Sequence, residues 1–402
     1  MTGKKNKYKE QLLRLADALV NNMMETPDEE ILAEAAEEYG NPTKAADEVQ
    51  EIIQRAFVAA GKERLRAANA KVRIRRAPDL GVLTFPVREK IAIVRKVITK
   101  AQKTGVCLTL AARKEEELAE ENLNAKLEAL VELGVVDDMG NLRQWHRGSI
   151  QSQVSDSDFP AEILLRELGV TEPEEIHRVE GIADYRGVTV HYRPLVGCEA
   201  HIVGFGDRAV AFINRTSSGP RQRFSLAHEL GHWHFHRGQI LTCETDGKLG
   251  TDDNDANAER SADTYAANLL MPRYLFLPRV HELGVTIETA EKLSNAFKTS
   301  ITATLIRLVK IGPEPAMLVC HSRRGRKWYI RGPTVSNKWV PKNELHPRSR
   351  ASKLFGKRKK NGRRRVRADM WLEHRDAASF EIYEQSRCVS NEVLTLLVFK
   401  PY

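Results

Sequence analysis

Ala227-His228-Glu229-Leu230-Gly231-His232 matches the pattern His-Glu-x-x-His and lies within a helix that we predict from Phe224 to His236. Residues four positions apart share one face of a helix, so the imidazoles of His228 and His232 converge on a single ion. Glu229 follows the first histidine and can reach a water molecule bound to that ion. The stretch therefore predicts a helix that carries a metal site.

A catalytic zinc takes three protein ligands and keeps one position open, so a third ligand must come from elsewhere in the chain. A longer motif with a third histidine is excluded, because Phe235 and Gly238 occupy its glycine and histidine positions. The next predicted helix, 256–270, opens instead with Glu259-Arg-Ser-Ala-Asp263. We expect Glu259 to be the third ligand and Asp263 to accept a hydrogen bond from the far nitrogen of a ligating histidine.

This set of residue types suits the hydrolysis of a peptide bond. Zinc lowers the pKa of a bound water toward ~7, and the carboxylate of Glu229 takes the proton as the water attacks a carbonyl. Mn²⁺ or Fe²⁺ would also suit two histidines and a glutamate. The alternative is a DNA-binding regulator or adaptor with a structural metal site, but such a site normally fills its fourth position with a protein ligand.

Several stretches together resemble the ImmA/IrrE family of metallopeptidases. They are Arg221 to His232, Glu259 to Pro272, Gly187-Val-Thr-Val, Pro194-Leu-Val-Gly, Phe212-Ile-Asn214 and Leu293 to Ser300, within about Ala161 to Gly312. The resemblance implies a cytoplasmic zinc endopeptidase that cleaves a helix-turn-helix repressor or antitoxin. It implies His228, His232 and Glu259 as ligands and Glu229 as the catalytic glutamate. Tyr265 and Ser261 depart from the family pattern, where phenylalanine and an acid are common.

The rest of the sequence predicts an α+β protein in four segments: a helical accessory domain over 1–140, a serine-rich linker over 141–158, a zincin-like metallopeptidase domain over 159–312, and a β-rich region over 313–402. Predicted helices are 8–24, 26–40, 43–71, 87–101, 115–133, 161–168, 174–184, 256–270, 287–297 and 301–309. Predicted strands are 106–110, 188–193, 201–204, 209–214, 316–321, 328–331, 379–383 and 392–399.

The net charge of +9 comes mainly from 348–367, which holds eleven Lys or Arg and no acid. Such density binds phosphate non-specifically, yet Phe355 is its only aromatic residue, so a nucleic-acid contact and a solvated loop both remain open. No stretch is apolar and long enough to cross a bilayer, so we expect no membrane association. Five scattered cysteines without CxxC spacing favour a reducing cytoplasm.

Other candidate residues have simpler explanations. His234 and His236 could stabilise an oxyanion or extend the metal site, but a structural role is favoured. Tyr265 lies at an aromatic position of an apolar helix face, which indicates core packing. The acids Asp252, Asp253 and Asp255 lack the spacing of an EF-hand. The pair 287–309 could be a DNA-reading helix-turn-helix, but its second helix offers few base-edge donors, which favours a packing element.

Overall fold

The computed structural model describes residues 27–39, 41–72, 84–104, 108–113, 120–145, 159–243, 253–355 and 360–399. The chain divides into two compact units, Met1–Ala60 and Gly61–Tyr402. Helices and two five-stranded sheets confirm the predicted α+β class. Among the described segments, no helix combines the length and apolar character that a membrane span requires.

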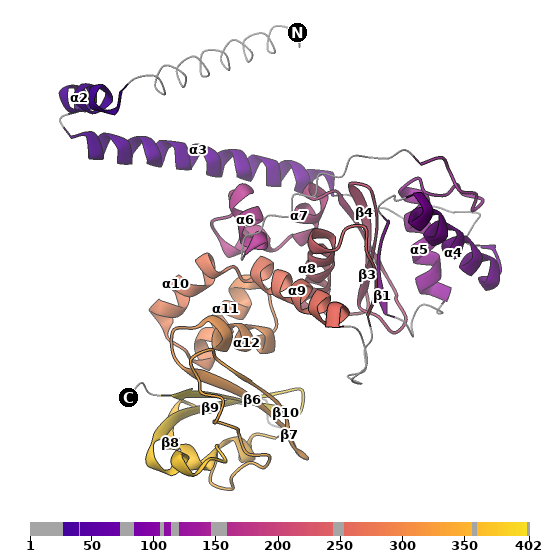
Figure 1. Cartoon of the computed structure of the whole chain (residues 1–402). Coiled ribbons are helices and arrows are strands. Elements are labelled where there is room, and N and C mark those ends of the chain that lie inside the picture. The colour runs from indigo at the N-terminus through magenta and orange to yellow at the C-terminus, as the bar shows by residue number, and fades with distance from the viewer. Residues whose placement is uncertain are drawn as a thin grey trace. The chain divides into compact units, whose positions relative to one another are not determined.

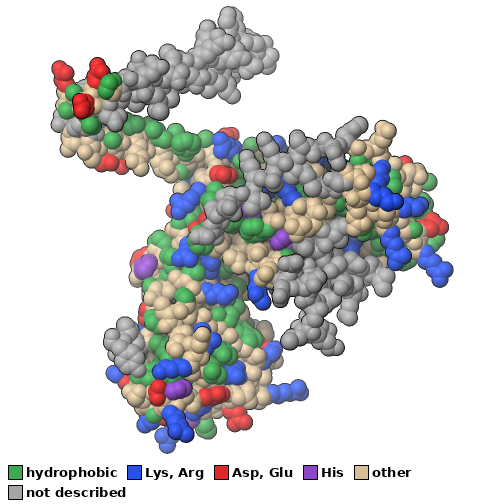
Figure 2. Space-filling view, viewed as in Figure 1, with side chains coloured by type: hydrophobic (Ala, Val, Ile, Leu, Met, Phe, Trp, Pro, Cys, Tyr) green, Lys and Arg blue, Asp and Glu red, His purple; other side chains and the backbone are tan. Residues whose placement is uncertain are grey.

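The first unit contains α2 (Asp28–Tyr39) and most of α3 (Pro42–Lys71), while the predicted helix 8–24 lies outside the described residues. The side chain of Asn41 caps α3, because its Oδ1 accepts hydrogen bonds from the backbone of Thr43 and Lys44. Hydrophobic side chains lie on the surface of α3 (Figure 2), and Phe57 is 70% exposed. The predicted helices 26–40 and 43–71 are therefore present as α2 and α3. Apolar side chains of α3 are exposed to solvent.

The first sheet is mixed and has the order β2-β4-β3-β1-β5. Its strands are β1 (Leu108–Arg113), β2 (Val188–Arg193), β3 (Ala200–Phe205), β4 (Arg208–Asn214) and β5 (Ile240–Cys243). β2 runs parallel to β4 and β1 parallel to β5, whereas β3 is antiparallel to both of its neighbours. Gly206 has φ +64° in the short turn between β3 and β4, a conformation that glycine adopts without strain.

Helices cover both faces of this sheet. Alternation along β3 and β4 sends Ile202 and Ala211 into a core shared with α8 (Gly219–Phe235), and Val203 and Val210 into a core with α4 and α5. Figure 1 shows α8 on one side of the sheet and α4 (Val87–Thr104) with α5 (Glu120–Glu132) on the other. α8, which carries the histidines, is therefore held against a buried sheet face.

β1 lies in the stretch 1–140, which the sequence assigns to an accessory domain. In the structure it pairs with β3 on one side and with β5 on the other, inside the sheet that supports α8. The division of the chain into four segments stays a prediction. One strand of the predicted accessory domain, β1, belongs to the first sheet together with strands of the predicted metallopeptidase domain.

The remaining helices lie before β2 or after β5 in the chain. They are α6 (Pro160–Glu167), α7 (Val179–Tyr185), α9 (Asp253–Leu270), α10 (Arg273–Leu283), α11 (Ile287–Phe297) and α12 (Ile301–Ile311). The predicted helix 174–184 is wrong as one element: a 3₁₀ turn over Pro173–Ile176 precedes α7. The carbonyl of Ile176 accepts a hydrogen bond from Arg223 in place of a helical amide, which explains the interruption.

The pair α11 and α12 packs within the main core. Leu305 and Leu308 are buried there, and Arg307 is 7% exposed and bonds Asn268 on α9 and the carbonyl of Met271. These contacts agree with the prediction that the pair packs within the domain rather than reading DNA, because the basic side chain of Arg307 on α12 points into the core.

The second sheet is antiparallel and has the order β7-β6-β10-β9-β8. Its strands are β6 (Ala316–Ser322), β7 (Gly325–Arg331), β8 (Arg364–Arg367), β9 (Glu381–Val389) and β10 (Glu392–Phe399). Ser390 and Asn391 both have positive φ and join β9 to β10 in a tight two-residue turn. The predicted β-rich region is confirmed, and the basic strand β8 was missed.

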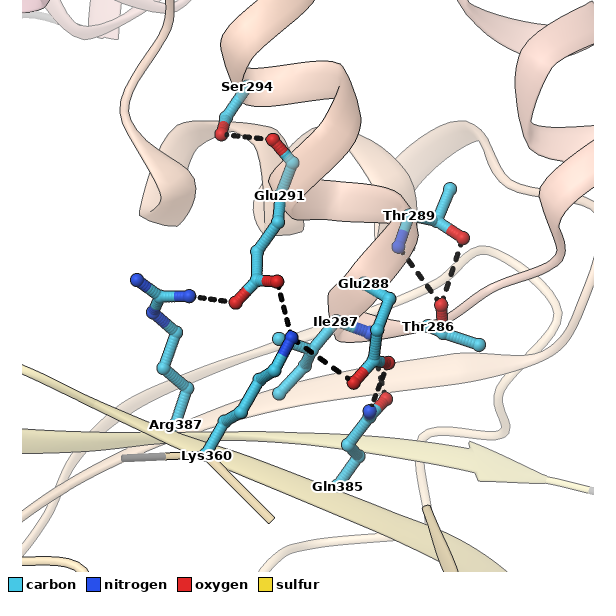
Figure 3. Close-up of polar contacts among 9 residues, drawn as sticks. All are labelled: Thr286, Ile287, Glu288, Thr289, Glu291, Ser294, Lys360, Gln385 and Arg387. Atoms are coloured by element: carbon cyan, nitrogen blue, oxygen red, sulfur yellow. Dashed lines mark hydrogen bonds and ion pairs between the residues drawn. The ribbon is translucent and has the colours of Figure 1, made fainter. Parts of the chain in front are cut away.

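A polar cluster joins α11 to this sheet (Figure 3). Glu291 binds Arg387 and Lys360, and Glu288 binds Lys360 and the amide of Gln385. Acids elsewhere neutralise more of the segment 348–367, through the pairs Arg363–Glu314, Arg365–Glu381 and Arg367–Asp369. Within its described part, much of this basic segment is therefore engaged with acids of the fold itself.

Candidate metal centre

α8 is seated on the sheet by a close contact between an aromatic ring and a glycine. Trp233 is 1% exposed, and a Cβ added to Gly204 on β3 would stand 2.3 Å from its ring. The indole donates a hydrogen bond to the carbonyl of Arg186. At the other end, Arg223 donates to the carbonyls of Phe297 and Ile176. These contacts fix the position and rotation of the helix that presents His228 and His232.

α9 approaches α8 at a second glycine. A Cβ on Gly231 would lie 2.8 Å from the Cα of Ala262, so the two backbones approach at van der Waals distance. Ala262 is fully buried and Tyr265 is 2% exposed beside it. This crossing brings Glu259, near the start of α9, to the histidine face of α8.

The side chains of His228, His232 and Glu259 form a single cluster, with one ligand atom from each within 4.8 Å of the others. The Nε2 atoms of the two histidines are 3.0 Å apart. The carboxylate of Glu259 places one oxygen 3.1 Å from Nε2 of His232 and the other 3.4 Å from Nε2 of His228. Bonds of about 2.0 to 2.1 Å to a tetrahedral zinc put neighbouring ligand atoms about 3.3 Å apart, so the cluster fits such an ion.

Asp263 lies one turn after Glu259, as the sequence places it, and its Oδ1 is 2.9 Å from Nδ1 of His228. Burial acts to lower the pKa of His228, but the hydrogen bonds to Asp263 and Glu259, with the nearby charge of Glu229, raise the pKa to about 10. His228 therefore holds a proton strongly when no ion competes for it. Metal binding and protonation are opposed at this ring.

Glu229 is 5% exposed, although it is a carboxylate next to His228. The same helix turn buries Leu226 and Leu230 on the sheet side. Its charge acts on the ring of His228, and this position beside the ligand cluster marks Glu229 as a functional candidate.

The remaining histidines of the helix differ in position. His236 is 9% exposed, and its Nδ1 lies 3.2 Å from Nδ1 of His232; burial lowers its pKa to about 4. His234 stacks on Tyr265 with ring centroids 5.4 Å apart, away from the cluster, and burial lowers its pKa to about 4. Burial raises the pKa of Tyr265 to about 12, as expected of a core phenol.

The contact of His236 with a candidate ligand was missed from the sequence, where a structural role was favoured. The signal was the repeat of the four-residue spacing, since His228, His232 and His236 share one helix face. Asp252 lies outside the described residues, and the side chains of Asp253 and Asp255 are not described.

A pocket of about 270 Å³ lies on a different face of α9. Its lining includes Phe235, Arg260, Thr264, Tyr265 and Asn268. None of the three residues of the cluster lines it. The pocket is therefore separate from the candidate metal centre.

Residues 183–309 match the family model of the IrrE N-terminal-like domain, Peptidase_M78. The resemblance to ImmA/IrrE family metallopeptidases is confirmed over this segment, which includes α8 and α9. A comparison with curated proteins found no match. Among solved structures, a Mycobacterium tuberculosis transcriptional regulator is similar at 12% identity and a TM-score of 0.42, over 59% of this chain and 74% of that one. The chain thus carries a metallopeptidase-like domain.

Proposed function

We propose that this ImmA/IrrE-type domain makes the chain a zinc-dependent endopeptidase that hydrolyses a peptide bond in a regulatory protein. One observation carries the proposal: the ligand atoms of His228, His232 and Glu259 gather within 4.8 Å, with the buried carboxylate of Glu229 adjacent in sequence to the first of them. Three protein ligands leave a fourth position for water or substrate.

In the proposed hydrolysis, zinc and the protein side chains have separate roles. Zinc, when bound, would polarise the scissile carbonyl and acidify the attacking water. His228, His232 and Glu259 would hold the ion, and Asp263 would keep the Nδ1 proton of His228 in place. Glu229 takes the proton from the attacking water and delivers it to the leaving amine nitrogen. The position of Glu229 supports this role, because it is buried and its charge acts on the ring of the candidate ligand His228.

Zinc is the proposed ion because two imidazoles and one carboxylate form its common hydrolytic ligand set. Mn²⁺ and Fe²⁺ bind similar sites when they are abundant. The identity of the metal as zinc therefore belongs to the proposal. Solvent reaches the cluster, because the side chains of His228 and Glu259 are 17% and 35% exposed.

The proposed substrate is a DNA-binding repressor or antitoxin of the helix-turn-helix type, in the cytoplasm. This class follows from the likeness to ImmA/IrrE proteins, which the match over 183–309 supports at the level of the family. Cys320 and Cys388 are thiols that form no disulfide in the described part of the chain, in keeping with a reducing compartment.

The competing proposal is a DNA-binding regulator or adaptor that uses the metal only for structure. A glutamate buried beside a three-ligand cluster favours the peptidase, because a structural site needs neither an open position nor a base. A DNA-binding regulator would need basic side chains that can contact phosphate. In the segment 348–367, the side chains of Lys360, Arg363, Arg365 and Arg367 pair with acids of the protein instead.

The test uses the full chain, its Glu229→Gln form, and Glu282→Gln on the exposed surface of α10 as a matched control. Each is incubated with the repressor-like product of a neighbouring gene, and cleavage is read by mass spectrometry. We expect Glu229→Gln to bind zinc and stay folded while cleavage falls at least ~10³-fold. Cleavage that persists in Glu229→Gln would contradict the proposal. Loss of function only on removal of a ligand would support the structural alternative.

A further inference from the structure

The two candidate histidine ligands have different partners behind them. Nδ1 of His228 meets a carboxylate, Asp263, at 2.9 Å. Nδ1 of His232 meets another imidazole, His236, with 3.2 Å between the two Nδ1 atoms. A histidine that binds a metal usually donates its second ring N–H to a carboxylate, a carbonyl or water, so an imidazole in this place is unusual.

The geometry defines which nitrogen carries which proton. The Nε2 atoms of His228 and His232 lie 3.0 Å apart and both face Glu259, so these are the atoms that face an ion. A ligating nitrogen offers its lone pair, which leaves the proton of each ring on Nδ1. At 3.2 Å, Nδ1–H of His232 can donate only if Nδ1 of His236 offers a lone pair. His236 must then carry its own proton on Nε2.

We propose that His236 is a positioning residue for the metal centre: its Nδ1 accepts the hydrogen bond from Nδ1–H of His232 and so holds that ring with Nε2 toward the ion. This inference rests on the proposed metal-dependent function and assigns one further side chain to it. His236 suits the role because it is the C-cap residue of α8, four residues after His232, and is 9% exposed.

The contact with His232 is distinct from the part that His236 plays in ending α8. The backbone amide of His236 bonds the carbonyl of His232 at 2.9 Å, as any residue at the end of this helix could. The ring contact needs an acceptor at the δ position of the side chain. Replacing the side chain therefore separates the two roles, because the backbone hydrogen bond remains.

His236 also limits how His232 can move. Ring centroids of His232 and His236 are 5.3 Å apart, and those of His228 and His232 are 4.7 Å apart. His232 is 1% exposed, so water is poorly placed to replace a lost acceptor. Without His236, the Nδ1 proton of His232 would be buried without its acceptor, which favours the tautomer that puts the proton on Nε2 and blocks the ion.

A pair of nearly isosteric variants tests the inference. His236→Asn keeps an acceptor, because Oδ1 of asparagine occupies the branch position of Nδ1, whereas His236→Leu has the same shape without one. The probe is Zn²⁺ in competition with a chelating indicator dye, applied to the full chain. His281→Leu, exposed on α10, is the control for loss of a histidine, and circular dichroism checks folding.

We expect His236→Leu to bind Zn²⁺ about 10 to 100 times more weakly than the unchanged chain, and His236→Asn to stay within about threefold. Equal affinity of His236→Leu and the unchanged chain, or equal losses in both variants, would overturn the inference. If His236→Leu does not fold, His236→Ala takes its place with the same expectation. Failure of the proposed function looks different, since the unchanged chain itself would then show no Zn²⁺ binding that depends on His228, His232 and Glu259.

Discussion

Gly231 of α8 lies directly against Ala262 of α9, so that a single added carbon would stand 2.8 Å from the Cα of Ala262. The contact decides where Glu259 lies, because α9 reaches the histidines only if the two helices cross closely. A fold-level feature without chemistry of its own therefore determines whether a third ligand is available to the cluster.

Gly231→Ala is expected to separate the helices. The added methyl group meets backbone, which cannot move aside as a side chain can, so we expect a loss of about 1 to 3 kcal/mol in unfolding free energy. Zn²⁺ affinity should fall with it as Glu259 moves away. Gly219→Ala is the control, because its added carbon meets nothing within 4 Å. Chemical denaturation and dye competition measure both effects, and unchanged Zn²⁺ affinity in Gly231→Ala would contradict this account of the crossing.

Zn²⁺ affinity is expected to rise with pH. The pKa of His228 is raised to about 10, so below that pH the ring is protonated and an ion must displace the proton. Apparent affinity should increase about tenfold per pH unit through the neutral range, and binding should release about one proton from this ring. Calorimetry in buffers of different ionisation enthalpy measures the release. Asp263→Asn, which weakens the hold on that proton, should flatten the pH dependence; an unchanged slope would argue against the role given to Asp263.

His201 is expected to make the fold sensitive to acid. It is 2% exposed, and burial, assisted by the charge of Lys126, lowers its pKa to about 3, below the 6.5 of an unfolded histidine. A neutral buried histidine stabilises the fold above pH 6.5, and this contribution is lost as pH falls from about 6.5 toward about 3. Between about pH 6.5 and about pH 4.5 the loss should reach about 2 kcal/mol.

Urea unfolding of His201→Gln at several pH values tests this. The substitution lowers stability at neutral pH, but it should remove much of the decline on acidification, because no buried imidazole remains to be protonated. His281→Gln, at an exposed position, should retain the full decline. A decline of the same size in His201→Gln would show that other groups cause it.

The ion pair of Glu291 on α11 with Arg387 on the second sheet is expected to contribute a measurable interaction energy to the stability of the fold. Glu291 is 26% exposed and Arg387 34%, so the pair is only partly screened by solvent. A double-mutant cycle with Glu291→Gln and Arg387→Gln is expected to give about 0.5 to 1.5 kcal/mol. Lys338 with Asp376, a more exposed pair, should give close to zero. Equal coupling energies for the two pairs would show that the partial burial adds nothing.

Much of this architecture follows from local patterns. The ranges of α11 and β10 agree with the predicted 287–297 and 392–399, because their apolar spacing is regular and polar residues bound them. The spacing of His228, His232, Glu259 and Asp263 also predicts which side chains lie together, since helix geometry alone places the first two on one face.

Other features depend on contacts that local patterns do not contain. α10 was missed because Pro278 lies inside it, where proline usually ends a helix. β8 was missed because Arg364 to Arg367 are nearly all basic, and the segment becomes a strand by pairing with β9, whose Glu381 and Glu384 lie opposite. The contact of His236 with His232 depends on ring rotations that spacing does not specify.

The place of β1 between β3 and β5 limits how this metallopeptidase-like domain could be transferred between proteins. A fragment cut at the serine-rich stretch would leave two strands with open backbone edges, and such edges invite association with other chains. We therefore expect recombination at that point to give a product that aggregates. A portable version has to begin upstream of Leu108, so part of the predicted accessory domain has to be transferred with the metallopeptidase-like domain.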